Sequence, residues 1–446
     1  MVDLLPALDR NSKKSLYEQL YEYVKQCAQN GVFLKNDKMP SVRAAASSLG
    51  ISKTTVVQAY DQLVLEGYLE ARDRSGYFIC ADSQQGHILS SAEPEVEFKS
   101  NFHTYNDEID EKTFDEKQWA GLIASVIRDK KSLLSYGEVF GEFPLRKAIN
   151  NYLAGMRGVV TEPTRIIIGA GMHNLINVLK SFIPQCKIAF EYPGFEKGMK
   201  LFAREGFDCV PIPLVKDGLD MDLLYKSGAR LVFVTPSHQY PTGAVMSVST
   251  RSRLIEWARS TDSYIIEDDY DSILRFHGRP IPALQGMDPA RIIHFGSFSK
   301  LIIPAMRISY MVLPKNLAKE LFESENLYMQ PVSRVEQLAL AEFIDRGYFE
   351  RHIRKIRKAY SVKNDNLTRI ITADNSPRIK LIGNQSGFHI LLKIDVGDIS
   401  ALRGMLLKKG IRIEPIAGLE NIVMVYYSGV EDEKEFYLAI KECVEG

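Results

Sequence analysis

Short apolar runs alternate with amphipathic stretches along most of the chain. The runs are RIIIGA, CKIAFEYP, RLVFVTPS, SYIIEDDY and RIIHFGSF, and segments with helical spacing lie between them. Strands that alternate with helices in this way are typical of a mainly parallel sheet covered on both faces. The pattern therefore predicts an α/β domain whose ligand-binding residues follow the carboxyl ends of its strands.

The first eighty residues have a different pattern. A first helix is predicted from apolar residues at helical spacing, namely Leu16, Leu20, Val24 and Cys27. A second short helix begins at Ser41 and ends at Gly50, and a third begins behind Ser52 as its N-cap. The following segment, YLEARDRSGYFICA, predicts a β-hairpin. Together these elements predict a winged helix-turn-helix.

A winged helix-turn-helix places the start of its third helix in the major groove of DNA. The residues expected near base edges or phosphates are Lys53, Thr54, Thr55 and Gln58. Candidates for phosphate contacts on the second helix and on the wing are Arg43, Arg72 and Arg74. The alternative is a small helical bundle without a nucleic-acid role, since acidic residues nearly match basic ones in this segment.

The composition is typical of a protein with several domains, but it does not identify the protein's partners. The 446 residues carry no net charge, and the five cysteines are scattered without metal-ligand spacing, so we expect several domains, no metal site and a reduced, cytoplasmic environment. The N-terminus lacks a signal-peptide pattern and no apolar run reaches the length of a membrane span, so no membrane partner is expected. Residues 81–97 are polar and predict a flexible linker.

Chemically distinctive residues follow the predicted strands. They include a glycine that opens a helix (Gly171), an aromatic residue (Phe195), carboxylates (Asp268 and Asp269), hydroxyl groups (Tyr270, Ser297 and Ser299) and a lysine (Lys300). Each of these residues alone is typical of a turn, a core or a solvated loop. Together they supply what pyridoxal phosphate needs: an amine, a carboxylate beside the pyridine nitrogen, a flat ring and phosphate donors.

Longer motifs connect these residues to a known family. The first eighty residues resemble the GntR-type winged helix, although DRSGYFI has a charged residue where that family has a glycine. The motifs YGEVFGEFPLRKAINNYLAGMRGV, TPSHQYPTG, IIEDDYDSILRF and GSFSKLIIPAMRISYMV resemble fold-type I aminotransferases. The two-part chain resembles the MocR (GabR-like) subfamily of GntR regulators, which fuses these two domains.

The resemblance implies four segments. They are a winged helix-turn-helix at 12–80, the linker at 81–97, a pyridoxal phosphate-binding large domain at 98–318 and a small C-terminal α/β domain at 319–446. It also implies a head-to-tail, domain-swapped homodimer, in which each winged helix lies near the large domain of the other subunit. Tyr136 would then contribute to the partner's cofactor site.

The resemblance further implies roles for individual residues. Lys300 would form the Schiff base with pyridoxal phosphate, Asp268 would face the pyridine nitrogen, Tyr270 would reach the ring hydroxyl and Phe195 would stack on the ring. The phosphate would be held by Gly171, Met172, Ser297, Ser299 and Arg307.

Two positions depart from the aminotransferase pattern. Tyr240 replaces the asparagine that often precedes PTG, and Met424 occupies the place of the arginine that clamps a substrate carboxylate. Lys197 and Arg412 are the two candidates for replacing that arginine, although Arg412 is also explained as a surface charge.

These observations favour a DNA-binding transcriptional regulator. It would sense pyridoxal phosphate, an amine that reacts with the Schiff base at Lys300, or both, and would control vitamin B6 or amino-acid metabolism. One alternative is an active aminotransferase with an appended DNA-binding domain, for which Met424 argues against efficient turnover. Another is a structural DNA-binding dimer whose cofactor site is inactive.

Overall fold

The computed structural model describes residues 5–80, 109–129, 133–216, 218–276, 281–323, 328–384 and 387–446. The chain divides into two compact units, Met1–Asn101 and Phe102–Gly446. The predicted linker, residues 81–97, lies outside the described residues. Within the described ranges, no helix combines the length and the apolar character needed to cross a membrane.

The N-terminal unit contains three helices and a hairpin. Its elements are α1 (Leu16–Gln29), α2 (Val42–Leu49), α3 (Lys53–Leu65), β1 (Leu69–Arg72) and β2 (Gly76–Ile79). Each helix begins behind a serine whose side chain accepts a hydrogen bond from the first turn, and these serines are Ser15, Ser41 and Ser52. Gly50 ends α2 in the left-handed conformation, at φ 62°.

The hairpin of the N-terminal unit pairs Leu69 with Ile79 and Arg72 with Gly76 in antiparallel register. A bridge between Lys38 and Phe78 joins the hairpin to the segment that precedes α2. The buried side chains of α3 complete one core with those of α1, so the predicted winged helix-turn-helix is confirmed.

The second unit is built on an eight-stranded sheet with the order β3-β10-β9-β8-β7-β4-β5-β6. Its strands are β3 (Ile166–Gly169), β4 (Lys187–Tyr192), β5 (Asp208–Val215), β6 (Gly218–Leu219), β7 (Leu231–Val234), β8 (Tyr264–Asp269), β9 (Ile292–Ser297) and β10 (Ser309–Val312). Neighbouring strands from β9 through β5 are parallel, whereas β10 runs antiparallel to both β9 and β3. The carboxyl ends of β3, β4, β7, β8 and β9 therefore lie at one edge.

Alternating side chains of these strands enter two different cores. Ile266 of β8 packs into the core formed with α7 (Met172–Lys180), α8 (Glu196–Arg204) and α11 (Lys315–Glu323). Its neighbour Ile265 packs into the core formed with α9 (Met221–Ser227) and α10 (Val248–Ser260). The sheet is thus covered on both faces, as the uninterrupted apolar runs predicted.

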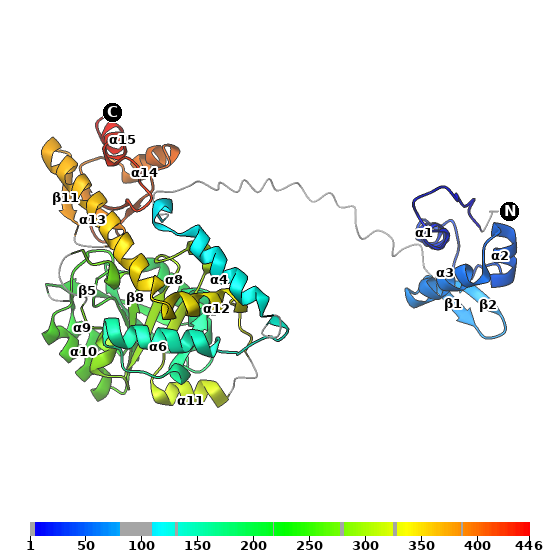
Figure 1. The fold of residues 1–446 in the computed structure, drawn as a ribbon, viewed down its shortest axis with the longest axis horizontal. Coiled ribbons are helices and arrows are strands. Elements are labelled where there is room, and N and C mark those ends of the chain that lie inside the picture. Colours follow the sequence, from blue (N-terminus) through cyan, green and yellow to red (C-terminus); the bar gives the residue numbers. More distant parts are fainter. Residues whose placement is uncertain are drawn as a thin grey trace. The chain divides into compact units, whose positions relative to one another are not determined.

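The remaining helices connect the sheet to the C-terminal region. They are α4 (Glu116–Arg128), α6 (Phe143–Arg157), α12 (Arg334–Asp345) and α13 (Tyr348–Asp374). The long helix α13 reaches a second, four-stranded sheet, near which α14 (Ile399–Lys408) and α15 (Glu433–Glu445) lie (Figure 1). This sheet has the order β11-β12-β14-β13, with strands Ile379–Gly383, His389–Ile394, Ile422–Tyr426 and Ile413–Pro415 in that order.

Candidate functional site

Three segments of the large sheet meet at the edge where the carboxyl ends of its parallel strands lie. Ser309 of β10 pairs with Gly169 of β3 on one side and with Ser297 of β9 on the other. Two residues beyond this row, and just outside the sheet, lie Gly171, Ser299 and Arg307. The pairing of the strands thus brings together the residues that the sequence predicted for phosphate binding.

Helix α7 begins in this row with an uncapped first turn. Gly171 is its N-cap at φ 87°, and within the described part of the chain no side-chain cap accepts a hydrogen bond from the first turn, which begins at Met172. A Cβ atom at Gly171 would lie 2.5 Å from Nη2 of Arg307. Free helix amides beside a guanidinium group form a site for an anion such as phosphate.

The two serines near this helix have different partners. Oγ of Ser297 accepts hydrogen bonds from Oγ of Ser309 at 3.0 Å and from the amide of Ser299 at 3.3 Å. Oγ of Ser299 is buried and has no hydrogen-bond partner among the residues that the structure describes. A buried hydroxyl without a partner costs free energy, so this atom fits a site that is completed by a bound acceptor.

Asp268 lies near the end of β8 and is buried, with 8% of its surface exposed. Burial raises the pKa of its carboxyl group to about 8, and the charges of Asp269 and Asp271 add to that effect. The positive charge of Lys300 acts in the opposite direction. A buried carboxyl group with a raised pKa fits a site that a cation such as a pyridinium would complete.

Lys300 follows β9 and reaches toward the small C-terminal sheet. Its Nζ lies 5.4 Å from the ring centroid of Tyr426 and 5.7 Å from that of Phe388. These distances are in the range of cation–π contacts. Because Lys300 also acts on the pKa of Asp268, the amine and the carboxyl group belong to one electrostatic site.

Aromatic rings cover the side of this site that faces α8. Phe195 is the N-cap of α8, and its ring stacks on Phe233 with a centroid distance of 6.0 Å. The ring of Tyr240 packs edge-on against that of Phe195, with a centroid distance of 5.8 Å. The ring centroids of Tyr240 and Tyr270 are also 5.8 Å apart. Gly198 leaves room for the Phe195 ring, because any Cβ atom at that position would overlap it.

A buried histidine beside Tyr270 was not predicted. Nδ1 of His238 lies 2.7 Å and 2.8 Å from the two carboxylate oxygens of Asp271, and 3.1 Å from the hydroxyl oxygen of Tyr270. The only sequence signals were a histidine within TPSHQYPTG and a third aspartate after EDDY. The pair fixes the position of Tyr270, whose pKa burial raises well above 10.

A second buried network supports the end of β8 from the opposite face. Arg157 of α6 donates from Nε to Oδ2 of Asp269 at 2.7 Å and from Nη2 to Oγ of Ser237 at 3.0 Å. Nδ1 of His294 lies 3.0 Å from Oε2 of Glu267. Although burial raises the pKa of Asp269, the charges of Arg157 and His294 outweigh it and lower that pKa. Asp269 is therefore a structural carboxylate.

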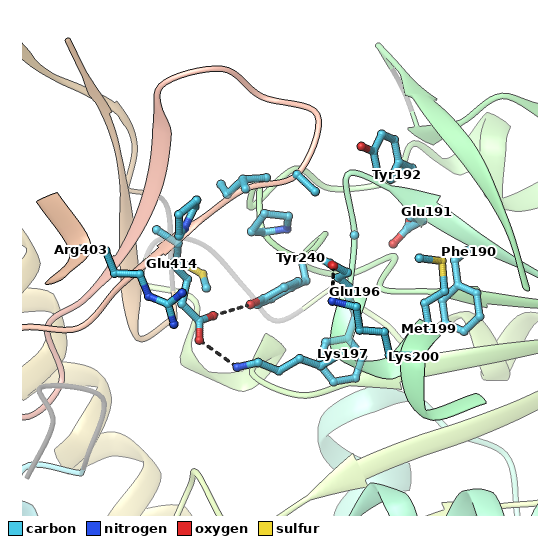
Figure 2. A pocket seen from close by; sticks show the side chains of 17 residues that line it. Phe190, Glu191, Tyr192, Glu196, Lys197, Met199, Lys200, Tyr240, Arg403 and Glu414 are labelled. Carbon is cyan, nitrogen blue, oxygen red and sulfur yellow. Dashed lines mark hydrogen bonds and ion pairs between the residues drawn. The ribbon is translucent and has the colours of Figure 1, made fainter. Parts of the chain in front are cut away.

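Beside Phe195 and Tyr240 lies a pocket of ≈ 210 Å³ between α8 and the C-terminal strands. Its walls include Lys197, Arg403, Glu414 and Met424. Figure 2 shows Lys197 and Tyr240 reaching toward the carboxylate of Glu414. Met424 is 1% exposed and pairs across the strands with Glu414, so the residue at the expected arginine position contributes only an apolar surface.

The two predicted substitutes for the missing arginine converge on one atom. Nζ of Lys197 lies 2.8 Å and Nη2 of Arg412 lies 2.6 Å from Oε1 of Glu414. About three quarters of the Arg412 side chain is buried, and its guanidinium is paired with Glu414. Arg412 is therefore not a solvated surface charge. Glu414 itself was not predicted, because a single glutamate in the alternating segment IRIEPIA gives no sequence signal.

Tyr136 lies on the surface of the second unit. Its side chain is 96% exposed, and it is not among the residues that line the pocket beside Phe195. The segment that carries it also exposes Leu134, at 87%.

The predicted DNA-contacting residues lie on the surface of the N-terminal unit. Lys53, Thr54 and Gln58 are exposed on the first turns of α3, and Arg43 is exposed on α2. The hydroxyl group of Thr55 is 2.8 Å from Oγ of the N-cap Ser52, which holds it at the helix start.

The two wing arginines differ in their surroundings. Arg72 bonds to Glu70 at 2.8 Å and to Asn36 at 2.7 Å, and its guanidinium lies over the Phe78 ring. Arg74 occupies the tip of the wing with φ 55° and is exposed.

Comparisons with known proteins agree with both units. Residues 16–79 match the family of bacterial regulatory proteins described as the gntR family. The fold of the second unit is similar to a kynurenine aminotransferase from Pyrococcus horikoshii, with a TM-score of 0.67 and 23% identity over 76% of this chain and 88% of that chain. This likeness shows a fold-type I aminotransferase-like architecture.

Several transcriptional regulators align with most of this chain. The HTH-type transcriptional regulator YhdI of Bacillus subtilis is 37% identical over 88% of this chain and 86% of its own length. The probable rhizopine catabolism regulatory protein MocR of Rhizobium meliloti is 34% identical over 79% and 76%. The pyridoxine biosynthesis transcriptional regulator PdxR of Corynebacterium glutamicum is 30% identical over 89% and 87%. The chain therefore belongs to the MocR-type GntR regulators, which bind DNA through a winged helix-turn-helix and carry an aminotransferase-like domain.

Proposed function

We propose that this regulator binds pyridoxal phosphate in the aminotransferase-like domain and that binding changes its affinity for DNA. The observation that carries the proposal is the anion site formed by the uncapped start of α7, the guanidinium of Arg307 and the unpartnered hydroxyl of Ser299. These groups come from three segments that β-sheet pairing brings together, and each lacks a complete set of partners without an anion.

The other residues of the site suit the rest of the cofactor. Pyridoxal phosphate supplies an aldehyde that reacts with amines and a ring that withdraws electrons. Lys300 provides the amine for the aldehyde, and the charge of Asp268 keeps a proton on the ring nitrogen. Phe195 covers one face of the ring, while Tyr240 and Tyr270 surround its polar edge. Met172 donates its amide, and Ser297 orients its neighbour Ser299.

The effector in this proposal is pyridoxal phosphate itself, an amine that reacts at the bound cofactor, or both. The apolar surface of Met424 supports the first version, because the site lacks the single arginine that holds a carboxylate in aminotransferases. The relative PdxR, whose name refers to pyridoxine biosynthesis, supports a role in the control of vitamin B6 metabolism. The relative MocR, a probable catabolism regulator, is consistent with control of amine or amino-acid metabolism.

We also propose a head-to-tail, domain-swapped homodimer. Tyr136 and Leu134 expose nearly all of their side chains, and Met329 is 82% exposed. Large apolar side chains with such exposure are typical of a surface that another molecule covers. In the dimer Tyr136 would complete the cofactor site of the partner, and each winged helix would lie near the partner's large domain.

The experiment that tests the cofactor site is a titration of the full-length protein with pyridoxal phosphate, followed by its visible absorbance. We expect saturable binding that Lys300→Ala abolishes, and a change in affinity for the DNA upstream of the protein's own gene as the site fills. Steady transamination of common amino acids, lost in Lys300→Ala, would instead support an enzyme. An absence of any absorbance change would refute the cofactor site.

A further inference from the structure

The carboxylate of Glu414 is held by groups from three separate parts of the fold. Nζ of Lys197, on α8, lies 2.8 Å from Oε1, and Nη2 of Arg412, just before β13, lies 2.6 Å from the same oxygen. The hydroxyl of Tyr240 donates to Oε2 at 3.4 Å. These are the donors with which a protein would bind the carboxylate of a ligand.

Burial and charge make Glu414 a good internal substitute for such a ligand. Its side chain is only 15% exposed, while that of Lys197 is 64% exposed and that of Arg412 is 27% exposed. Burial raises the pKa of Glu414, but Lys197 and Arg412 outweigh this effect and lower it, so the group is ionised at neutral pH. Lys197, Arg412 and Glu414 form a trio with a net positive charge, because two cations pair with one carboxylate.

The position of this trio connects it to the cofactor site. Lys197, Tyr240 and Glu414 line the same pocket as Phe195, and Figure 2 shows Lys197 and Tyr240 pointing into it toward Glu414. Met424 lies directly opposite Glu414 on the neighbouring strand. Lys197, in the pocket wall, and Arg412, which is not among the residues that line the pocket, therefore both reach the carboxylate that lies opposite Met424.

We propose that Lys197 and Arg412 form a carboxylate clamp, and that a small amino acid displaces the Glu414 carboxylate from this clamp when it binds. This inference rests on the proposed function, because the amino group of the ligand would form a C=N bond to the aldehyde carbon of the cofactor while the C=N bond to Lys300 breaks and Lys300 leaves as a free amine. It defines the amine effector more closely, as a molecule that carries both an amino group and a free carboxylate. Release of Glu414 would also free β13 from α8, which offers a route from the pocket to the rest of the domain.

A matched series of ligands tests the clamp in the full-length, cofactor-loaded protein. The probes are straight-chain ω-amino acids from glycine to 6-aminohexanoate, each compared by calorimetry with the alkylamine that remains when its carboxylate is removed. The measured quantity is the ratio of the two dissociation constants. In the unmodified protein we expect at least one amino acid of the series to bind more tightly than its amine.

The variants separate a clamp from a structural ion pair. Glu414→Gln removes the competing charge and should increase the preference for the carboxylate about tenfold, whereas Lys197→Met and Arg412→Met should each decrease it about tenfold. Lys197 is mostly exposed, so its variant is expected to fold and is decisive. Lys187→Met is the control, because it removes the same charge from β4 near Asp208, 3.7 Å away, and does not line the pocket.

Several results would overturn the inference. A ratio that stays within about twofold of the unmodified value in all three variants, with the cofactor bound, would make the ion pairs structural and would leave the proposed function intact. If no amino acid of the series binds even to Glu414→Gln, the ion pairs are likewise structural and the proposed function is left intact. Failure of the unmodified protein to bind pyridoxal phosphate would refute the proposed function and this inference together.

Discussion

Asp268 and Asp269 are neighbours in β8, yet their pKa values shift in opposite directions. Successive side chains of a strand leave opposite faces of the sheet. Asp269 meets the buried guanidinium of Arg157, and its carboxylate is stabilised. Asp268 leaves the other face, where burial and the charges of nearby carboxylates raise its pKa and the charge of Lys300 lowers it. Asp269 is thus a structural carboxylate, whereas the surroundings of Asp268 suit a positively charged ligand.

Asp268 should make the stability of the cofactor-free protein depend on pH. Its pKa in the folded protein, about 8, exceeds the ordinary value of 3.8. The group therefore stabilises the fold most at low pH, and this contribution is lost as the pH rises through the folded-state pKa. Asp268→Asn should raise the melting temperature at about pH 9 by about 2 °C or more, while it weakens binding of pyridoxal phosphate.

The matched control is Asp269→Asn, which removes a carboxylate that has a buried partner and should lower the melting temperature. Differential scanning calorimetry of both variants at low and high pH provides the comparison. A lower melting temperature for Asp268→Asn at high pH would contradict the assignment of Asp268 as an unfavourably buried charge.

At the scale of single elements, the start of α7 has a feature that a glycine alone makes possible. The left-handed φ of Gly171 and the closeness of Arg307 both exclude a side chain there. Gly171→Ala should displace the guanidinium and reduce the affinity for pyridoxal phosphate about tenfold or more. A cofactor titration measures this effect.

Gly155→Ala is the control for that substitution. Gly155 lies within α6, and a Cβ atom there would meet nothing within 4 Å. Alanine at this position should preserve cofactor affinity and slightly increase stability. Equal affinities for the two variants would show that the start of α7 does not bind the phosphate.

Helix α6 is joined to β8 by the buried pair of Arg157 and Asp269, whose side chains are 0% and 5% exposed. Arg157→Leu should lower the free energy of unfolding by about 3 kcal/mol, because it leaves a buried carboxylate without its partner. Arg253→Leu, which breaks an exposed pair with Asp222, should cost at most about 1 kcal/mol. Denaturant unfolding of both variants tests this difference, and equal losses would contradict it.

Local patterns were sufficient to predict most elements and the residues that follow each strand. Apolar runs marked the strands, and Lys300 and Asp268 were recognisable because they directly follow or end such runs. The contacts of Glu414 were not predictable in this way, since its partner Lys197 is 217 residues away in sequence. The pairing of His238 with Asp271 likewise depends on how β7 and β8 lie side by side, which no local pattern specifies.

At the scale of the whole molecule, each of the two units provides the residues for one part of a regulator's function. The N-terminal unit exposes polar and basic residues at the start of α3 and on α2, as a module that binds the major groove requires. The second unit contains the residues that are proposed to bind the cofactor. A ligand can change DNA affinity only if it binds one arrangement of the protein more tightly than another.

Arg43 tests the DNA-binding surface. If its exposed guanidinium contacts a phosphate, Arg43→Ala should weaken binding to all sequences similarly and should reduce the slope of log affinity against log salt by about 1. Binding titrations at several salt concentrations measure that slope. Arg10 is a suitable control, because its guanidinium is bonded to the Gly50 carbonyl at 2.8 Å. A change for Arg10→Ala alone would place the DNA elsewhere on this unit.

The central claim is that cofactor occupancy at Lys300 controls DNA binding, and one measurement tests it most directly. The affinity for the DNA upstream of the protein's own gene is measured with and without pyridoxal phosphate, for the unmodified protein and for Lys300→Ala. The account predicts that the cofactor changes affinity or footprint in the unmodified protein and changes neither in Lys300→Ala. Identical DNA binding with and without cofactor, in a protein whose absorbance shows the site to be filled, would contradict it.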